Sequence, residues 1–190
     1  MKNLSIVQYN APVTLTFGII SLIALILGMI TDNASTLAVF SVYSSSAANP
    51  LFYIRLFGHI FGHYNFEHFF NNMVLLLLLG PILEEKYGAR YIIIAMALTA
   101  LITGIIQVLF FNSVLLGASG IVFMFMLLSG FAGARSRRIP LTLVLCVLIF
   151  LGREVHNAIV LDNNISQAAH IIGGLCGSFF GFYANSKQHV

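Results

Sequence analysis

Long apolar runs recur along almost the whole chain and constrain its fold more than any other feature. The runs measure roughly 16 to 20 residues, the length that an α-helix needs to cross a bilayer. Hydrophobic residues make up 59% of the chain and charged residues only 8%, which is more apolar than a soluble domain. We therefore predict an all-α, polytopic membrane protein in which residues 1–190 form a single membrane domain.

Charged and turn-forming residues divide the apolar sequence into six predicted membrane spans. The first span is longer than the apolar core of a cleavable signal peptide, so we expect it to be retained. The long first loop, residues 31–67, is too interrupted to span. Its aromatic and basic stretch at residues 51–57 predicts an amphipathic segment in the outer interface. The predicted spans cover residues 13–30, 68–83, 91–110, 119–133, 139–151 and 165–183.

The basic residues between the spans predict the orientation of the bundle. Arg55 and Arg153 fall on one side, and the other side carries Lys2, Lys86, Arg90, Arg135, Arg137, Arg138 and Lys187. Because Lys and Arg favour cytoplasmic loops, we expect both termini in the cytoplasm and a multi-pass protein of the bacterial plasma membrane. The chain has no tryptophan, so Tyr and Phe must form any aromatic belt. The basic residues do not gather into a patch suited to nucleic acid, which we exclude as a partner.

Ser119 opens the fourth predicted span within Gly117-Ala118-Ser119-Gly120. A serine at a helix start can simply be an N-cap. The span, however, is only about 22 Å long at about 1.5 Å per residue, against a hydrocarbon core of about 30 Å. Ser119 is therefore predicted to lie below the outer surface. The flanking glycines allow close approach of another chain, with the backbone N–H groups of Ser119 and Gly117 available to an oxyanion.

His170 lies one turn inside the sixth predicted span, before a row of glycines at Gly173, Gly177 and Gly181. Glycines four residues apart predict tight packing against a neighbouring helix. The span enters from the outer side, so His170 is expected at a depth similar to that of Ser119. The structural alternative is an imidazole that bonds a carbonyl of a neighbouring helix.

His68 and Asn72 are four residues apart and share one face of the second predicted span. That span also begins at the outer side. An imidazole and a carboxamide at this depth can donate to a developing oxyanion. Asn71 is the alternative to Asn72 for this role.

Three predicted spans thus bring a serine, a histidine and an asparagine to the outer third of the membrane. A serine needs a base to become nucleophilic at neutral pH, and a tetrahedral intermediate needs hydrogen-bond donors. Ser119, His170, His68 and Asn72 form a minimal acyl-transfer site that requires no metal and no cofactor. Because no acidic residue lies near His170 within its span, we expect a Ser–His dyad and not a triad.

These motifs resemble those of the rhomboid intramembrane serine proteases, and the resemblance extends over essentially the whole chain. The family has a six-helix core with a Gly-x-Ser-Gly motif on the fourth helix, similar to Gly117–Gly120 here. The resemblance implies that Ser119 is the nucleophile and His170 the general base. It also implies that His68-x-x-x-Asn72 belongs to the oxyanion hole.

The resemblance also covers a structural motif, Gly80-x-x-x-Glu84-x-x-x-Gly88, to which we assign no chemistry. Two positions differ from the family pattern. Phe123 replaces a frequent tyrosine four residues after the nucleophile, so stacking on the histidine is kept and a hydroxyl is lost. Ile54-Arg55 replaces a frequent Trp-Arg pair. The implied substrates are single-pass or polytopic membrane proteins, cleaved in or near a transmembrane segment within the lipid bilayer.

Three other functions compete with this hypothesis. A metalloprotease is suggested by His59, His63, Glu67 and His68, although His-Glu-x-x-His is missing. A catalytically silent rhomboid-like protein that binds membrane clients would typically lack the serine or the histidine. A transporter is disfavoured because no acidic residue lies inside a predicted span and no inverted repeat is visible. The sequence does not predict the oligomeric state.

Overall fold

A computed structural model describes residues 8–132 and 164–187, with isolated positions between them at Leu141, Val144, Leu145, Leu148, Ile149 and Gly152. This described part is helical, and its only β pairing is an isolated bridge between Val42 and Leu115. The elements are α1 (Pro12–Ile30), α2 (Ala34–Val39), α3 (Pro50–Gly58), the short 3₁₀ helix η1 (His59–Phe61), α4 (Phe66–Tyr87), α5 (Ala89–Phe110), α6 (Ser119–Ala132) and α8 (Asn164–Lys187).

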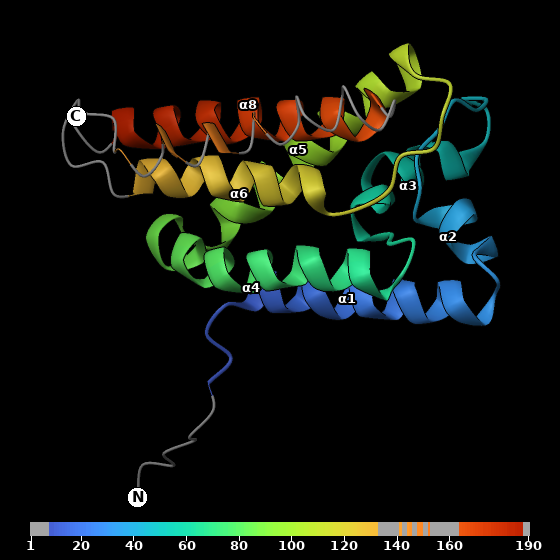
Figure 1. The fold of residues 1–190 in the computed structure, drawn as a ribbon, viewed down its shortest axis with the longest axis horizontal. Coiled ribbons are helices and arrows are strands. Elements are labelled where there is room, and N and C mark those ends of the chain that lie inside the picture. The colour runs from blue at the N-terminus through green and yellow to red at the C-terminus, as the bar shows by residue number, and fades with distance from the viewer. Residues whose placement is uncertain are drawn as a thin grey trace, which may run out of the picture.

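The helix α6 lies at the centre of the bundle, between α4 and α8 in Figure 1, with α1 on the outer side of α4. Every residue from Gly120 to Met126 is buried, as expected of a helix that is apolar all round. The start of α1 and the end of α8 lie at one end of the bundle, whereas α2 and α3 lie at the other.

Three of the described helices, α1, α4 and α5, are long and apolar enough to cross a membrane. Shorter apolar stretches occupy Ser119–Phe131 in α6 and Ala169–Ala184 in α8. The all-helical prediction is confirmed for the part of the chain that is described. The fifth predicted span, residues 139–151, lies outside the described residues apart from the isolated positions above. The count of six spans and the cytoplasmic location of both termini stay predictions.

The second predicted span ends too early at residue 83, because α4 continues to Tyr87. We expected the charge at Glu84 to mark the end of the apolar run. Instead Glu84 is buried, and its carboxylate accepts hydrogen bonds from the backbone N–H groups of Val13 and Thr14 and from the hydroxyl of Thr14. The first N–H groups of α1 have no acceptor within their own helix, so they are free to donate to this carboxylate. These hydrogen bonds explain how a charge can lie inside the bundle.

Close backbone contacts within the first loop hold its segments together. A Cβ on Gly58 would overlap the carbonyl oxygen of Val39, and one on Gly62 would overlap that of Phe40. Arg55, which the sequence predicts to lie in the outer interface, is buried. Its Nε donates to the carbonyl of Ala38 at 2.9 Å, and its guanidinium lies 4.4 Å from the centroid of the Tyr43 ring. Arg55 therefore joins parts of the loop and does not point outward.

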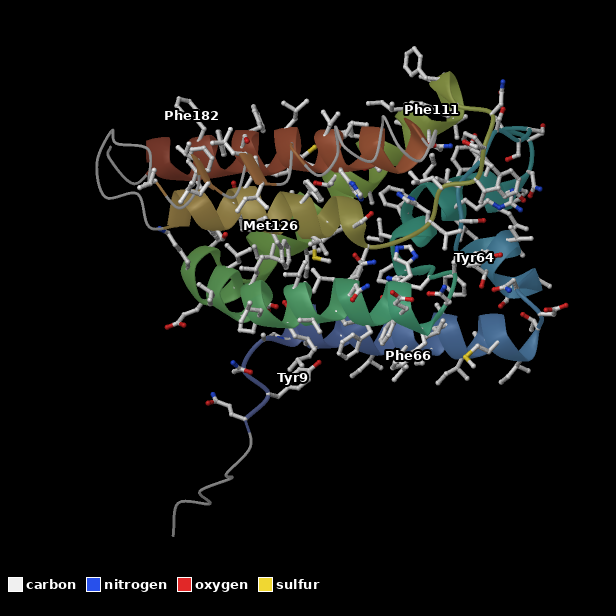
Figure 2. The ribbon with its side chains drawn as sticks, viewed as in Figure 1. Tyr9, Tyr64, Phe66, Phe111, Met126 and Phe182 are labelled. Carbon is white, nitrogen blue, oxygen red and sulfur yellow. The ribbon has the colours of Figure 1, made fainter. Side chains whose placement is uncertain are left out.

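Exposed aromatic side chains mark both ends of the bundle (Figure 2). Tyr64 and Phe66 lie at the end that holds α2 and α3, whereas Tyr9 and Phe182 lie at the opposite end. Aromatic rings favour the two membrane interfaces. Their placement fits a bundle that crosses the bilayer roughly along its helix axes.

Candidate active site

Ser119 is the first residue of α6, and the segment before it is held from three directions. Leu115 pairs with Val42 through two backbone hydrogen bonds of 2.8 and 2.9 Å. The N–H of Gly117 donates to the carbonyl of His59 at 2.9 Å. The side chain of Gln107, buried in α5, donates to the carbonyl of Ser113 at 2.8 Å. These bonds fix the point at which α6 begins.

The helices α6 and α8 meet with their backbones in contact. A Cβ on Gly173 would overlap the carbonyl oxygen of Gly120, and a Cβ on Gly177 would overlap that of Met124. The Cβ position of Gly120 is itself 3.3 Å from the carbonyl oxygen of Ala169. We call this contact the glycine seam. It places the residue after Ser119 against the residue before His170.

The ring of His170 lies flat on the ring of Phe123, with centroids 4.5 Å apart and an interplanar angle of 3°. Phe123 follows Ser119 by four residues, so both side chains leave the same face of α6. The stack therefore orients the His170 imidazole along the face of α6 that begins with Ser119.

His68 reaches the same place from the first turn of α4. Gly117 has a φ of +125°, a conformation that L residues rarely adopt. Its Cβ position would lie 2.8 and 2.9 Å from Cε1 and Nε2 of His68, and 3.9 Å from Oγ of Ser119. The imidazoles of His68 and His170 are also close enough to interact electrostatically. Glycine at position 117 thus makes room for His68 beside Ser119.

A role for the N–H of Gly117 in binding an oxyanion is not supported, because that N–H already donates to His59. The contribution of Gly117 is the space it leaves for His68. The choice between Asn71 and Asn72 is clearer, since Asn71 is exposed and Asn72 is buried. One N–H of the Asn72 amide donates to the carbonyl of His68 at 3.1 Å, and a carboxamide has a second N–H to donate.

Comparison with models of protein families finds a match. The model of the Rhomboid domain matches residues 51–187, which is well over half of the chain and includes Ser119, His170, His68 and Asn72. The chain belongs to the rhomboid family. Its members are typically intramembrane serine proteases. No curated protein shows significant sequence similarity to this rhomboid.

Sequence reasoning treated His59 and His63 only as part of a metal cluster, yet both are buried beside the site of this rhomboid. Burial lowers the pKa of His59 to about 4, although hydrogen bonds with the backbone of Arg55 and Leu56 oppose the shift. Burial, and secondly the charge of His68, lower the pKa of His63 to about 4. The His63 ring stands edge-on to that of His68, with centroids 5.1 Å apart. Both histidines are neutral at pH 7 and support the site by packing.

The metal-cluster hypothesis finds no support among the residues that the structure describes. Glu67 points outward, and Nδ1 of His59 lies 3.1 Å from the carbonyl oxygen of Arg55 in the preceding turn. No three His, Cys, Asp or Glu side chains of the described ranges are grouped as ligands to one ion.

A row of buried polar residues on α5 was also missed. Thr99, Thr103 and Gln107 are four residues apart and face the interior. The two threonine hydroxyls donate to carbonyls one turn earlier in the same helix, while Gln107 holds the segment before Ser119. The signal was present in the sequence, since polar residues at helical spacing inside an apolar run rarely face lipid.

Proposed function

We propose that this rhomboid hydrolyses peptide bonds in or near the transmembrane segments of other membrane proteins, with Ser119 as nucleophile and His170 as general base. The observation that carries the proposal is the stack of His170 on Phe123, one helical turn from Ser119 on the same face of α6. A serine at the start of α6 and an imidazole stacked on the same face of that helix are the residue types of an acyl-transfer pair.

In the proposed first step, His170 accepts the proton of the Ser119 hydroxyl while Oγ attacks the scissile carbonyl carbon. The resulting oxyanion accepts hydrogen bonds from the N–H of Ser119, which has no acceptor within its own helix, and from the side chains of His68 and Asn72. His170 then gives its proton to the departing amine, and the C–N bond breaks. Water, deprotonated by His170, hydrolyses the acyl-enzyme and restores Ser119.

The surroundings of the site favour this chemistry because they leave little freedom to the reacting groups. The glycine seam holds α6 against α8, the Phe123 ring restricts rotation of His170, and the bonds to His59 and Gln107 fix the segment before Ser119. Positioned groups of this kind lower the barrier because the cost of orienting them is met in folding.

The substrate must present an accessible carbonyl, which a regular helix hides in its own hydrogen bonds. Gly or Pro near the cleavage site would ease local unwinding of a substrate span. We therefore expect cleavage beside small or helix-breaking residues. An uninterrupted poly-leucine span should be resistant.

The test is cleavage of a model transmembrane substrate in liposomes by the wild type, Ser119→Ala and His170→Ala. Both variants should lose at least about 10³-fold in kcat, and a chelator should have no effect. Ser129→Ala is the matched control, because the Ser129 hydroxyl donates to the carbonyl of Met126 in the same helix and takes no part in the proposed reaction. Cleavage by Ser119→Ala at the wild-type rate would refute the proposal. Substrate binding without any cleavage by the wild type would favour the client-binding alternative.

A further inference from the structure

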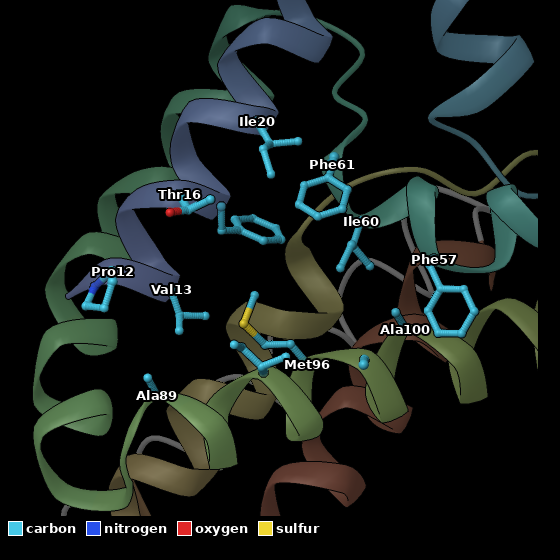
Figure 3. Close-up of a pocket in the computed structure, with 13 residues that line it drawn as sticks. Pro12, Val13, Thr16, Ile20, Phe57, Ile60, Phe61, Ala89, Met96 and Ala100 are labelled. Carbon is cyan, nitrogen blue, oxygen red and sulfur yellow. The ribbon is translucent and has the colours of Figure 1, made fainter.

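An apolar groove separates α1 from α5 on the side of the bundle away from the glycine seam. Its volume is about 510 Å³, within the usual range of about 300 to 1,000 Å³ for small-molecule sites. Figure 3 shows α1 and α5 as its two walls, with Ile60 and Phe61 of η1 closing it between them. Among the lining side chains only Thr16 carries a polar atom.

The groove has a buried floor and an exposed rim. Phe17, Ile60 and Met96 on the floor are at most 7% exposed, whereas Ile20 and Ile93 on the rim are 37% and 53% exposed. The opening therefore lies on the lipid-facing surface of two apolar helices that are long enough to span. Water in such a groove would find almost no hydrogen-bond partner. A hydrocarbon chain fits its chemistry.

One end of the groove carries positive charge. Ala89, the first residue of α5, lines that end, and Arg90 follows it. Arg90 is exposed and shares a helix face with the lining residues Ile93 and Ala97, three and seven positions later. The first turn of α5 has no side-chain cap and no acidic residue, so its N–H groups add to the positive field.

Two carboxylates, Glu84 and Glu85, precede this end of the groove on α4, and neither forms an ion pair with Arg90 among the residues that the structure describes. Glu84 is buried and accepts three hydrogen bonds from the start of α1. Glu85 is exposed to solvent on α4. Arg90 therefore remains the group best placed to meet a ligand that enters the groove from this end.

We propose that the groove binds an anionic phospholipid, with one acyl chain between α1 and α5 and the phosphate on Arg90. A guanidinium matches phosphate with paired hydrogen bonds, and the field of the helix start favours the same anion. Exposed leucines such as Leu77 and Leu78 of α4 do not line the groove. Lipid there should exchange freely.

The experiment uses the full-length protein as Ser119→Ala, so that its result does not depend on proteolysis. The protein is placed in phosphatidylcholine nanodiscs with a trace of phosphatidylglycerol that carries a photoreactive diazirine on one acyl chain. Crosslinked peptides are then located by mass spectrometry. We expect labelling concentrated on the groove residues Phe17, Ile93 and Met96. Unlabelled phosphatidylglycerol should compete at least about tenfold better than added phosphatidylcholine, a difference of about 1.4 kcal/mol.

Substitutions at Arg90 and Ala97 distinguish the contribution of the headgroup from that of the acyl chain. Arg90→Gln should abolish the preference for phosphatidylglycerol, whereas Arg90→Lys should keep part of it. Ala97→Phe should fill the groove and remove the labelling. Leu98→Phe is its matched control, because Leu98 is 41% exposed and does not line the groove. If Ala97→Phe does not fold, the proposal is tested by competition of the two unlabelled lipids in the parent protein and in Arg90→Gln.

Labelling spread evenly over α1, α4 and α5, or equal competition by the two lipids, would overturn the proposal. So would unchanged labelling in folded Ala97→Phe.

Discussion

The two sides of the bundle are built in opposite ways. At the glycine seam, α8 presses on α6 until backbone meets backbone, and a single added Cβ has no room. On the other side, α1 and α5 stand apart around a groove of about 510 Å³. Within a membrane, helices associate mainly through close packing and hydrogen bonds. The tight side carries the proposed catalytic pair, so this comparison links packing precision to the position of the chemistry.

The short helix η1 joins the two sides. The carbonyl of His59 accepts the N–H of Gly117 beside Ser119, while the next two residues, Ile60 and Phe61, line the groove. A change on the loose side can reach the site through this element, or through Gln107 of α5, whose side chain donates to the carbonyl of Ser113 before Ser119. The comparison therefore predicts that substitutions at the seam reduce stability and activity far more than substitutions at the groove rim.

Adding a side chain at the seam gives the largest effect that we expect from a single substitution. Gly173→Ala should force α8 away from α6, at a cost of about 3 kcal/mol in the free energy of unfolding, and should lower kcat at least about tenfold. Gly174→Ala is the control, because its Cβ meets only the Leu127 side chain at ordinary contact distances of 3.7 and 3.9 Å. Thermal unfolding in detergent and substrate cleavage measure both effects. Equal behaviour of the two variants would mean that the seam is not tight.

Acidification should destabilise η1 and the residues that follow it, which lie between the two sides of the bundle. His59 and His63 have native pKa values of about 4, below the ordinary value of 6.5, so the unfolded chain binds more protons between these limits. Above pH 6.5 both histidines are neutral in the folded and the unfolded chain, and the free energy of unfolding has its full value. As the pH falls toward 4, it decreases by up to about 3 kcal/mol for each histidine.

The unfolding midpoint measured from pH 7.5 to 4.5 tests this prediction. His63→Gln should show a shallower decline than the wild type, because only one of the two groups then titrates. A midpoint that does not change over this range would contradict the burial of the two neutral imidazoles.

The joint between α1 and α4 should show an intermediate effect. Glu84→Gln keeps the shape of the side chain but weakens three hydrogen bonds from the start of α1, which should cost about 2 kcal/mol. Glu85→Gln alters the neighbouring, exposed carboxylate and should change stability by less than about 0.5 kcal/mol. Chemical denaturation in mixed micelles can compare them. If Glu84→Gln leaves the free energy of unfolding unchanged, the position of α1 does not depend on this carboxylate.

The groove rim should tolerate truncation best. Ile93→Ala removes a side chain that is 53% exposed, and we expect a loss of less than about 0.5 kcal/mol. Its neighbour Ile92 is fully buried in the core, so Ile92→Ala should cost at least about 2 kcal/mol. A large effect of Ile93→Ala in detergent would mean that the rim is packed against protein and that the contrast between the two sides is weaker than the structure indicates.

Much of the helical framework could be predicted from the sequence, because apolar run length is a local property. The apolar runs that contain α1, α5 and α6 are continuous, and polar or turn-forming residues separate them from their neighbours. The site residues were found for a related reason, since Ser119, His170 and Asn72 are polar side chains within or beside apolar runs. Their common depth in the membrane is a prediction that rests on helix length alone.

The remaining features depend on contacts between distant residues. The burial of Glu84 needs the start of α1, 70 positions earlier, so its charge was misread as the end of a span. The fold of the first loop needs the Val42–Leu115 bridge and the backbone contacts at Gly58 and Gly62. The hydrogen bond from Gly117 to His59 likewise joins two loops. None of these pairings has a periodic signal in the sequence.

The most direct test of the central claim is labelling of the purified rhomboid with a fluorophosphonate probe, followed by mass spectrometry of the modified peptide. We predict labelling at Ser119 that is lost in both Ser119→Ala and His170→Ala and is retained in Ser129→Ala. Absence of labelling in folded wild-type protein, while an active rhomboid protease is labelled in parallel, would contradict an activated serine at the start of α6.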